Sequence, residues 1–332
     1  MPHPNFPALP ITEVLEPLSA ALAARSRVLL CAPPGAGKST LVPLSLLESA
    51  WLGAGKILML EPRRLAARAL AARMAQLLGE PLGSTVGVRT RLETRVGRNT
   101  RIEVVTEGIL TRMLQADPEL SGIACVIFDE FHERSLNADL GLALSLECQD
   151  ALREDLRVLV MSATLDVAPL ARLLDDATVV SAQGRSFDVS VQHVARRAEI
   201  PLELQTAQVV RQALGEHEGD VLCFLPGAGE IRRVERVLAE SPGAGSGGAR
   251  VRVLPLYGDL SMDQQDAALR PAARGERKVV LATSIAETSL TIEGVAIVVD
   301  AGLRRYSEFD PVTGMSRLTT GKVSQASAES CW

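Results

Sequence analysis

Val28-Leu29-Leu30-Cys31-Ala32-Pro33-Pro34-Gly35-Ala36-Gly37-Lys38-Ser39-Thr40 is the stretch of this chain that decides its fold. An apolar run leads into a turn rich in glycine and proline, and residues 41–47 after it are again mostly apolar. This order is typical of a buried strand, a loop and a helix. Glycines allow successive backbone N–H groups to point at an anion, and the helix N-terminus adds the positive end of its dipole. We therefore predict an α/β fold with a phosphate-binding loop.

The loop matches the nucleotide-binding pattern G-x-x-x-x-G-K-[ST], except that Ala32 stands at the first glycine. In this pattern Lys38 neutralises β- and γ-phosphate oxygens, and Ser39 supplies a hydroxyl to a bound Mg²⁺ ion. Because a lysine in a surface loop adds little to the core, we expect Lys38→Ala to abolish nucleotide binding without unfolding the chain. An ordinary glycine-rich turn is the alternative, and the loop alone also leaves kinases and GTPases open. The residues expected to contact the nucleotide are Pro34, Gly35, Ala36, Gly37, Lys38, Ser39 and Thr40.

A second apolar run, residues 123–128, ends in Asp129-Glu130-Phe131-His132. Two adjacent carboxylates at the end of a buried strand suit a site for magnesium and water, because Asp129 can hold the hydrated ion while Glu130 polarises the attacking water. Taken alone, the segment would also fit a solvated acidic turn. A third apolar run, residues 158–161, is followed by Ser162-Ala163-Thr164. The order of the three elements favours nucleoside-triphosphate hydrolysis.

These three elements resemble the DEAH-type superfamily 2 helicases. Three further segments resemble motifs of the same family. Leu60-Glu61-Pro62-Arg63-Arg64-Leu65-Ala66-Ala67 is similar to motif Ia, Thr106-Glu107-Gly108-Ile109-Leu110 to motif Ib, and residues 281–292 to motif V. The resemblance covers nearly the whole chain, from Leu15 to Glu329.

The resemblance implies ATP and Mg²⁺ as cofactors, bound between two RecA-like domains, and hydrolysis that is coupled to movement along a nucleic-acid strand. It implies that Ser39 and Asp129 hold the metal ion. The implied catalytic group consists of Asp129, Glu130, His132, Ser162 and Thr164, of which the last three couple hydrolysis to domain movement.

The resemblance implies further roles for other residues. Arg73 is expected to stack on the base of the nucleotide, and Glu287 and Thr288 to face both nucleotide and nucleic acid. Contacts to the sugar-phosphate backbone position a strand without reading its sequence. They are expected from Arg63, Arg64, Thr106 and Thr283. The implied partner is single-stranded nucleic acid, with RNA favoured over DNA.

Apolar runs also divide the chain into two domains. In the first part, runs that predict strands alternate with stretches that predict helices, which is the pattern of a parallel sheet. The pattern restarts after residues 180–185, and we predict two tandem RecA-like domains, residues 1–182 and 183–332, each a mostly parallel sheet flanked by helices. The predicted strands are residues 28–31, 57–60, 102–105, 123–128, 158–161 and 179–180, and then 221–225, 251–256, 279–282 and 296–299. Residues 241–248 predict a glycine-rich loop, and residues 306–318 a β-hairpin.

Motif VI of the family follows a Gln-Ala-Ser-Ala-Glu segment, but here Ser330-Cys331-Trp332 follows it. We expect the chain to be truncated before motif VI, as a fragment or a truncated gene product. Since arginine fingers contribute roughly a thousandfold or more to the rate, we expect feeble hydrolysis. An ATP-responsive nucleic-acid clamp that scarcely hydrolyses ATP is therefore an alternative function, and another P-loop enzyme, a kinase or GTPase, is a second one.

Composition excludes several other classes. The chain of 332 residues is 47% hydrophobic and carries a net charge of −5, which argues against indiscriminate coating of nucleic acid. Its 5 cysteines include no C-x-x-C pair, so a metal or disulfide role is not expected. Neither a membrane-spanning run nor a signal peptide is present in the sequence, and we expect a cytoplasmic protein. The sequence does not indicate the oligomeric state.

Overall fold

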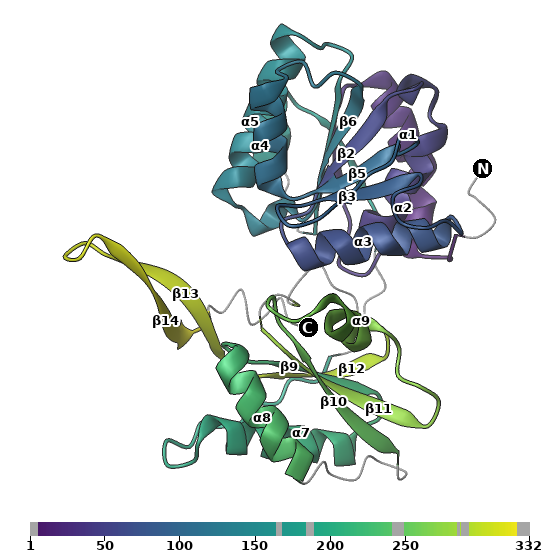
Figure 1. Ribbon diagram of the computed structural model, residues 1–332. Coiled ribbons are helices and arrows are strands. Elements are labelled where there is room, and N and C mark those ends of the chain that lie inside the picture. Colours follow the sequence, from purple (N-terminus) through teal and green to yellow (C-terminus); the bar gives the residue numbers. More distant parts are fainter. Residues whose placement is uncertain are drawn as a thin grey trace. The chain divides into compact units, whose positions relative to one another are not determined.

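The computed structural model describes residues 6–163, 168–183, 189–240, 249–283, 286 and 292–323. The chain divides into two compact units, Met1–Phe187 and Asp188–Trp332 (Figure 1). The predicted boundary between residues 182 and 183 stays a prediction.

The first unit is built on an eight-stranded sheet with the order β4-β3-β5-β2-β6-β7-β1-β8. Its strands pair in parallel, except that β4 is antiparallel to β3. Both faces of such a sheet are covered, which explains why its strands are near-continuous apolar runs. The strands are β1 (Arg27–Cys31), β2 (Lys56–Leu60), β3 (Val86–Arg89), β4 (Thr94–Arg95), β5 (Ile102–Val105), β6 (Ile123–Phe128), β7 (Arg157–Ser162) and β8 (Thr178–Ser181).

Helices cover the two faces of this sheet and enclose two hydrophobic cores (Figure 1). Neighbouring strand residues point to opposite faces, so Val28 and Leu30 pack with residues of α1, α2 and α3, whereas Leu29 packs with residues of α4 and α5. The helices are α1 (Leu15–Ala24), α2 (Lys38–Ser45), α3 (Arg64–Leu77), α4 (Glu107–Ala116), α5 (Leu136–Ala151) and α6 (Ala168–Leu173), with 3-10 helices η1 (Pro10–Val14), η2 (Leu46–Glu48), η3 (Ala50–Leu52) and η4 (Phe131–Glu133).

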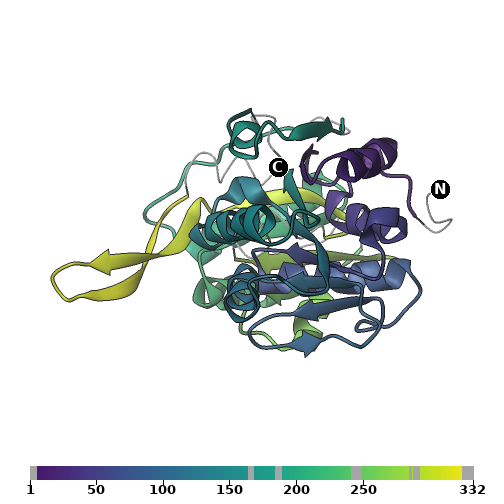
Figure 2. The ribbon, with the colours of Figure 1, turned by 90° about the horizontal axis from the view of Figure 1, so that it is seen from above.

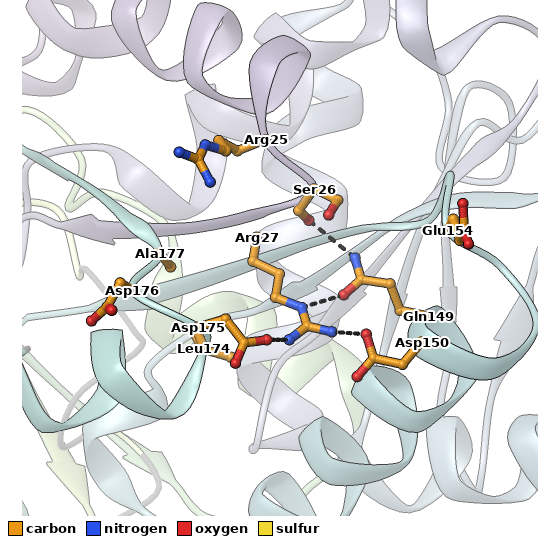
Figure 3. Close-up of a pocket in the computed structure, with 10 residues that line it drawn as sticks. All are labelled: Arg25, Ser26, Arg27, Gln149, Asp150, Glu154, Leu174, Asp175, Asp176 and Ala177. Atoms are coloured by element: carbon orange, nitrogen blue, oxygen red, sulfur yellow. Dashed lines mark hydrogen bonds and ion pairs between the residues drawn. The ribbon is translucent and has the colours of Figure 1, made fainter.

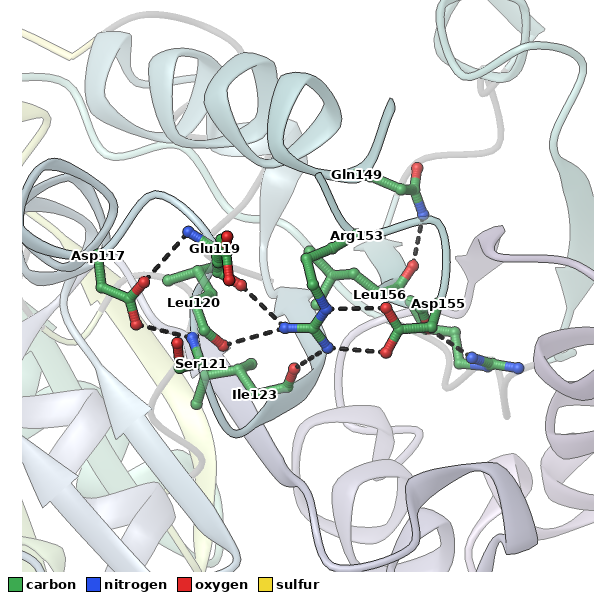
Figure 4. Close-up of polar contacts among 10 residues, drawn as sticks. Asp117, Glu119, Leu120, Ser121, Ile123, Gln149, Arg153, Asp155 and Leu156 are labelled. Atoms are coloured by element: carbon green, nitrogen blue, oxygen red, sulfur yellow. Dashed lines mark hydrogen bonds and ion pairs between the residues drawn. The ribbon is translucent and has the colours of Figure 1, made fainter. Parts of the chain in front are cut away.

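The loop that leads into β6 is held by the guanidinium of Arg153 (Figure 4). Its Nη1 donates to the carbonyl oxygen of Glu119 at 2.8 Å, and its Nη2 donates to that of Ile123 at 3.1 Å. Asp155 pairs with the same guanidinium at 2.8 Å. These contacts fix the start of β6, whose other end carries Asp129.

The second unit has a four-stranded parallel sheet with the order β10-β11-β9-β12, and α7 and α8 pack against it around a third hydrophobic core. A separate antiparallel hairpin, β13–β14, projects beyond this sheet in both views (Figures 1 and 2). The elements are α7 (Leu202–Glu216), β9 (Asp220–Phe224), α8 (Ala228–Glu240), β10 (Arg250–Leu256), α9 (Met262–Leu269), β11 (Glu276–Ala282), β12 (Val295–Asp300), β13 (Leu303–Asp310) and β14 (Met315–Lys322).

The α/β class and the two mostly parallel sheets confirm the predicted fold. The hairpin also lies where the turn residues indicated it. Neither β3 nor β4 was predicted, because β3 has only four residues and contains a glycine, and β4 has only two residues and no apolar run. The expected glycine-rich loop, residues 241–248, lies outside the described residues. Within the described part of the chain, no helix has both the length and the apolar character needed to cross a membrane.

Candidate active site

The phosphate-binding loop joins β1 to α2, and its backbone shape depends on two glycines. Gly35 and Gly37 have φ values of 73° and 91°, in the left-handed region that L side chains rarely adopt. A Cβ atom on Gly37 would lie 2.5 Å from Cδ1 of Leu9. The N–H of Ile11 donates to the carbonyl oxygen of Ala36 at 3.1 Å and supports the loop from the same side. The segment that precedes α1 therefore helps to shape this loop, and the positive φ and the nearby side chain of Leu9 both favour glycine at position 37.

Lys38 begins α2 and is paired with Glu130. Its Nζ lies 2.7 Å from Oε1 of Glu130, and the two residues are only 3% and 5% exposed. The premise that Lys38 is a surface lysine was therefore wrong, because the sheet brings a carboxylate from 92 positions away against it. Burial alone would lower the pKa of Lys38, but the negative charges of Asp129, Glu130 and Glu61 raise it above its ordinary value. Lys38 is thus a buried cation that faces carboxylates.

Asp129 has an oxygen without a partner. Its Oδ1 accepts the N–H of Glu130 at 2.9 Å, but its Oδ2 is buried and accepts no hydrogen bond from any described residue. Burial raises the pKa of Asp129 to about 6, and the neighbouring charge of Glu130 adds to this effect. Lys38 and the nearby hydroxyl of Ser39 act in the opposite direction. The carboxyl group is therefore held in a place where its charge lacks full compensation.

A hydrated Mg²⁺ ion fits this arrangement. Magnesium keeps several of its waters and takes one or two carboxylates together with phosphate oxygens. The buried Oδ2 of Asp129, which accepts no hydrogen bond from a described residue, and the hydroxyl of Ser39 are oxygen ligands of the kind that Mg²⁺ takes. The described residues contain no group of three or more His, Cys, Asp or Glu side chains that could hold a metal by themselves.

The turn that carries Glu130 is strained. Glu130 and Arg134 have φ values of 49° and 48°, each of which costs a residue other than glycine on the order of 1–3 kcal/mol. Phe131 holds the turn between them, because it is buried and meets the ring of Phe128 edge-on at 6.1 Å. The guanidinium of Arg134 lies 5.5 Å from the centre of the Phe131 ring. Strain of this kind is frequent where a side chain must be aimed at a site.

His132 connects Glu130 to the end of β7. Its Nε2 lies 3.4 Å from Oε2 of Glu130, and its Nδ1 accepts the N–H of Ala163 at 3.3 Å. Burial, followed by the charge of Lys38, lowers the pKa of His132, which favours the neutral ring. Because Nδ1 is an acceptor, we infer that the proton is on Nε2. The neighbouring Ser162 accepts the N–H of Ala32 with its carbonyl oxygen at 3.0 Å, so the three predicted motifs meet in this unit.

Two family models match the chain: the DEAD/DEAH box helicase model over residues 14–173, and the helicase conserved C-terminal domain model over residues 205–316. Together they cover most of the chain and include the site described above. The chain belongs to the DEAD/DEAH box helicases. This result confirms the resemblance that the motifs indicated.

Relatives within this helicase family are longer than the chain. It is 53% identical over 320 residues to the ATP-dependent RNA helicase HrpB of Escherichia coli K12, of which it covers 39%. It is 36% identical over 299 residues to the probable ATP-dependent RNA helicase DHR2 of Saccharomyces cerevisiae, of which it covers 41%. A crystal structure of the Escherichia coli DEAH/RHA helicase HrpB matches 98% of the chain with a TM-score of 0.89 and 52% identity, and 41% of that structure is covered. The chain therefore spans about two fifths of these helicases.

The residues predicted to contact nucleic acid lie in both units. Arg63 pairs with Glu133, its Nη2 lying 3.2 Å from Oε2, whereas Arg64 is exposed in the first turn of α3. Thr106 directly precedes α4, and Thr283 follows β11 in the second unit. No nucleic acid is present to test these residues, and their roles stay predictions.

Of the remaining predicted residues, the structure describes Arg73 but not Thr164, Glu287 or Thr288. Arg73 is exposed on α3, where its Nη1 donates to Oε1 of Gln76 at 2.8 Å. Thr164, Glu287 and Thr288 lie outside the described residues. Stacking by Arg73 therefore stays a prediction.

Two carboxylates near the site were missed by sequence reasoning. Glu61 follows β2, is 1% exposed and contributes to the charge around Lys38. Glu133 directly follows His132 and pairs with Arg63. Glu61 carries the same signal as Asp129, an acidic residue at the end of an apolar run, and could have been found by it. Glu133 had no such signal.

A pocket of about 340 Å³ lies elsewhere in the first unit (Figure 3). Arg25, Ser26 and Arg27 line it, so it lies at the amino end of β1, whereas the phosphate-binding loop follows the carboxyl end. The guanidinium of Arg27 is paired there with Asp150 and Asp175. No residue that was predicted for the helicase site lines this pocket.

Proposed function

We propose that the chain is the ATP-hydrolysing part of a nucleic-acid helicase that couples hydrolysis to movement along RNA. The observation that carries this proposal is the buried Lys38–Glu130 pair next to a carboxyl oxygen of Asp129 that accepts no hydrogen bond within the described part of the chain. A cation for phosphate, a carboxylate for metal and a carboxylate for water are all present within one small region. Nucleoside-triphosphate hydrolysis requires these groups.

Each residue has a distinct role in this proposal. Lys38 leaves Glu130 and contacts the phosphates, while Ser39 and Asp129 hold Mg²⁺, which neutralises phosphate charge when it is bound. Glu130, once released, orients a water molecule and accepts its proton. His132 keeps Glu130 in place through Nε2–H. The hydrogen bond from the N–H of Ala163 to His132 then links the position of Glu130 to the Ser-Ala-Thr segment.

The nucleic-acid side of the proposal rests on Arg63, Arg64, Thr106 and Thr283, which occupy motifs for backbone contact. Cationic and hydroxyl groups bind phosphates and sugars without reading the bases. The Escherichia coli and Saccharomyces cerevisiae relatives are named as RNA helicases, which supports RNA as the partner.

The test is phosphate release from Mg²⁺-ATP by the chain, measured with and without single-stranded RNA and with DNA of the same length. We expect RNA to increase the rate, and Asp129→Asn to shift the Mg²⁺ requirement to higher concentrations. Retention of RNA in the presence of ATP, without phosphate release, would instead favour an ATP-responsive clamp. Transfer of the phosphoryl group to another substrate, or a requirement for GTP, would contradict the proposal.

A further inference from the structure

We propose that Glu133 is a positioning residue. When a nucleic-acid phosphate binds Arg63, Glu133 transmits that change to the position of Glu130. This inference rests on the proposed function, and it assigns a role to a residue outside the predicted site. Three contacts in the first unit support it: a side-chain pair, a backbone hydrogen bond and a second carboxylate beside Arg63.

The side-chain pair joins Arg63 to the strained turn. Nη2 of Arg63 lies 3.2 Å from Oε2 of Glu133, and the two side chains are 20% and 22% exposed. The pair is thus shielded enough to be specific and open enough for a phosphate to reach the guanidinium. Arginine binds phosphate oxygens with the same N–H groups that it offers to a carboxylate. A bound phosphate therefore competes with Glu133 for Arg63.

The backbone hydrogen bond joins Glu133 to Glu130. The N–H of Glu133 donates to the carbonyl oxygen of Glu130 at 2.9 Å across the 3-10 turn η4. Buried Phe131 anchors the middle of this turn, and the residues at its two ends, Glu130 and Arg134, have positive φ values. A turn held in this way has few ways to move. Displacement of the Glu133 end is therefore transmitted to the backbone of Glu130.

A second carboxylate contacts the backbone of Arg63. The N–H of Arg63 is 3.4 Å from Oε1 of the buried Glu61, whose charge acts on Lys38. Lys38 is in turn paired with Glu130. Arg63 is therefore linked to Glu130 by contacts through Glu133, and Glu61 beside it adds to the negative charge around Lys38. An event at Arg63 has a direct physical route to the groups that handle phosphate and water.

The experiment compares Glu133→Gln with Asp139→Asn in the whole chain. Both substitutions replace a carboxylate that pairs with an arginine near the same turn, but Asp139 pairs with the exposed Arg134 and not with Arg63. For each variant we would measure the affinity for Mg²⁺ and the non-hydrolysable analogue AMPPNP, with and without a labelled oligouridylate. The ratio of the two affinities is the coupling factor, and the reverse titration must return the same value.

We expect a coupling factor of at least about fivefold in the unsubstituted chain and in Asp139→Asn. In Glu133→Gln the coupling factor should fall to within about twofold of one, so that the two ligands bind almost independently. The same variant should bind oligouridylate about two- to fivefold more tightly without nucleotide, because Arg63 is no longer shared with a carboxylate. A role limited to stability would not change the ratio. Thermal melting identifies any variant that fails to fold. Arg63→Gln tests the other member of the pair. The variant with both Glu133→Gln and Arg63→Gln should lose no more coupling than either single variant.

An unchanged coupling factor in folded Glu133→Gln would overturn the proposal. So would an unsubstituted chain that binds AMPPNP and oligouridylate independently, since no coupling would then exist to transmit. A chain that binds neither ligand would refute the proposed function itself. The two failures are therefore distinguishable.

Discussion

Nζ of Lys38 lies 2.7 Å from Oε1 of Glu130, and both side chains are buried in the first unit. In the proposed function the same lysine must contact the phosphates of ATP. Phosphate and carboxylate therefore compete for one cation, and Glu130 is engaged until a nucleotide arrives. Release of Glu130 at that moment would limit its activity to the nucleotide-bound state.

Lys38→Ala is expected to destabilise the fold as well as to abolish nucleotide binding. Removing one member of a buried ion pair leaves the other charge without compensation, at a cost on the order of 3 kcal/mol. Urea unfolding of Lys38→Ala and of Lys38→Ala with Glu130→Gln measures this cost. The double variant should recover most of the loss, because the unpaired charge is removed. Equal stabilities of the unsubstituted chain and Lys38→Ala would show that the pair contributes nothing.

Glu130→Gln is expected to bind Mg²⁺-ATP more tightly while hydrolysing it more slowly. An amide competes less well for Lys38 than a carboxylate does, which should improve the affinity by up to about tenfold. Loss of the general base should slow the chemical step by about 10²–10⁴. Equilibrium binding and single-turnover phosphate release measure the two effects separately, with Asp139→Asn as the control for loss of one charge. A single-turnover rate equal to that of the unsubstituted chain would exclude Glu130 as the base.

The pKa of Asp129 predicts a pH dependence of stability in the absence of nucleotide and Mg²⁺. Burial raises this pKa from 3.8 to about 6, so the folded chain binds the proton more tightly than the unfolded chain does. The resulting stabilisation is fully present below pH 3.8 and is lost as the pH rises through about 6. The difference corresponds to roughly 3 kcal/mol.

Asp129→Asn removes this titration and leaves that of His132 in place. The free energy of unfolding of the unsubstituted chain should therefore fall relative to that of Asp129→Asn between about pH 4 and about pH 7. Urea unfolding of both proteins at several pH values gives this difference directly. Parallel curves would mean that Asp129 has an ordinary pKa.

Gly37→Ala is expected to be more damaging than Gly35→Ala. Both glycines have positive φ, so each alanine costs about 1–2 kcal/mol in backbone conformation. A Cβ atom at position 37 would also collide with Leu9 at 2.5 Å, whereas at position 35 it meets nothing within 4 Å. The free energies of unfolding of the two variants should differ by at least about 1 kcal/mol. Similar free energies of unfolding would indicate that the residues before α1 move aside without a measurable loss of stability.

Much of the fold was predictable because its signals are local. The strand, loop and helix at residues 28–45 follow from an apolar run, from glycines that tolerate positive φ, and from a second apolar stretch. Most other parallel strands were marked by the same near-continuous apolar runs, since both faces of the sheet are buried. Strand β3 was missed, because it is only four residues long and contains a glycine. Strand β4 carries no such signal, because it is held in the sheet only by its pairing with β3.

The sequence by itself determined which chemical groups stand at the ends of the strands: Lys38, Ser39, Asp129 and Glu130 were all named from patterns of neighbouring residues. Only the tertiary structure decided what those groups contact. The sheet order, which places β6 and β7 between β2 and β1, brings Glu130 to Lys38 across 92 positions and Glu133 to Arg63 across 70. The raised pKa of Asp129 likewise depends on burial by segments distant in the chain. Backbone conformation and periodicity are set by adjacent residues, whereas ion pairs and desolvation depend on distances through space, which no short stretch of sequence contains.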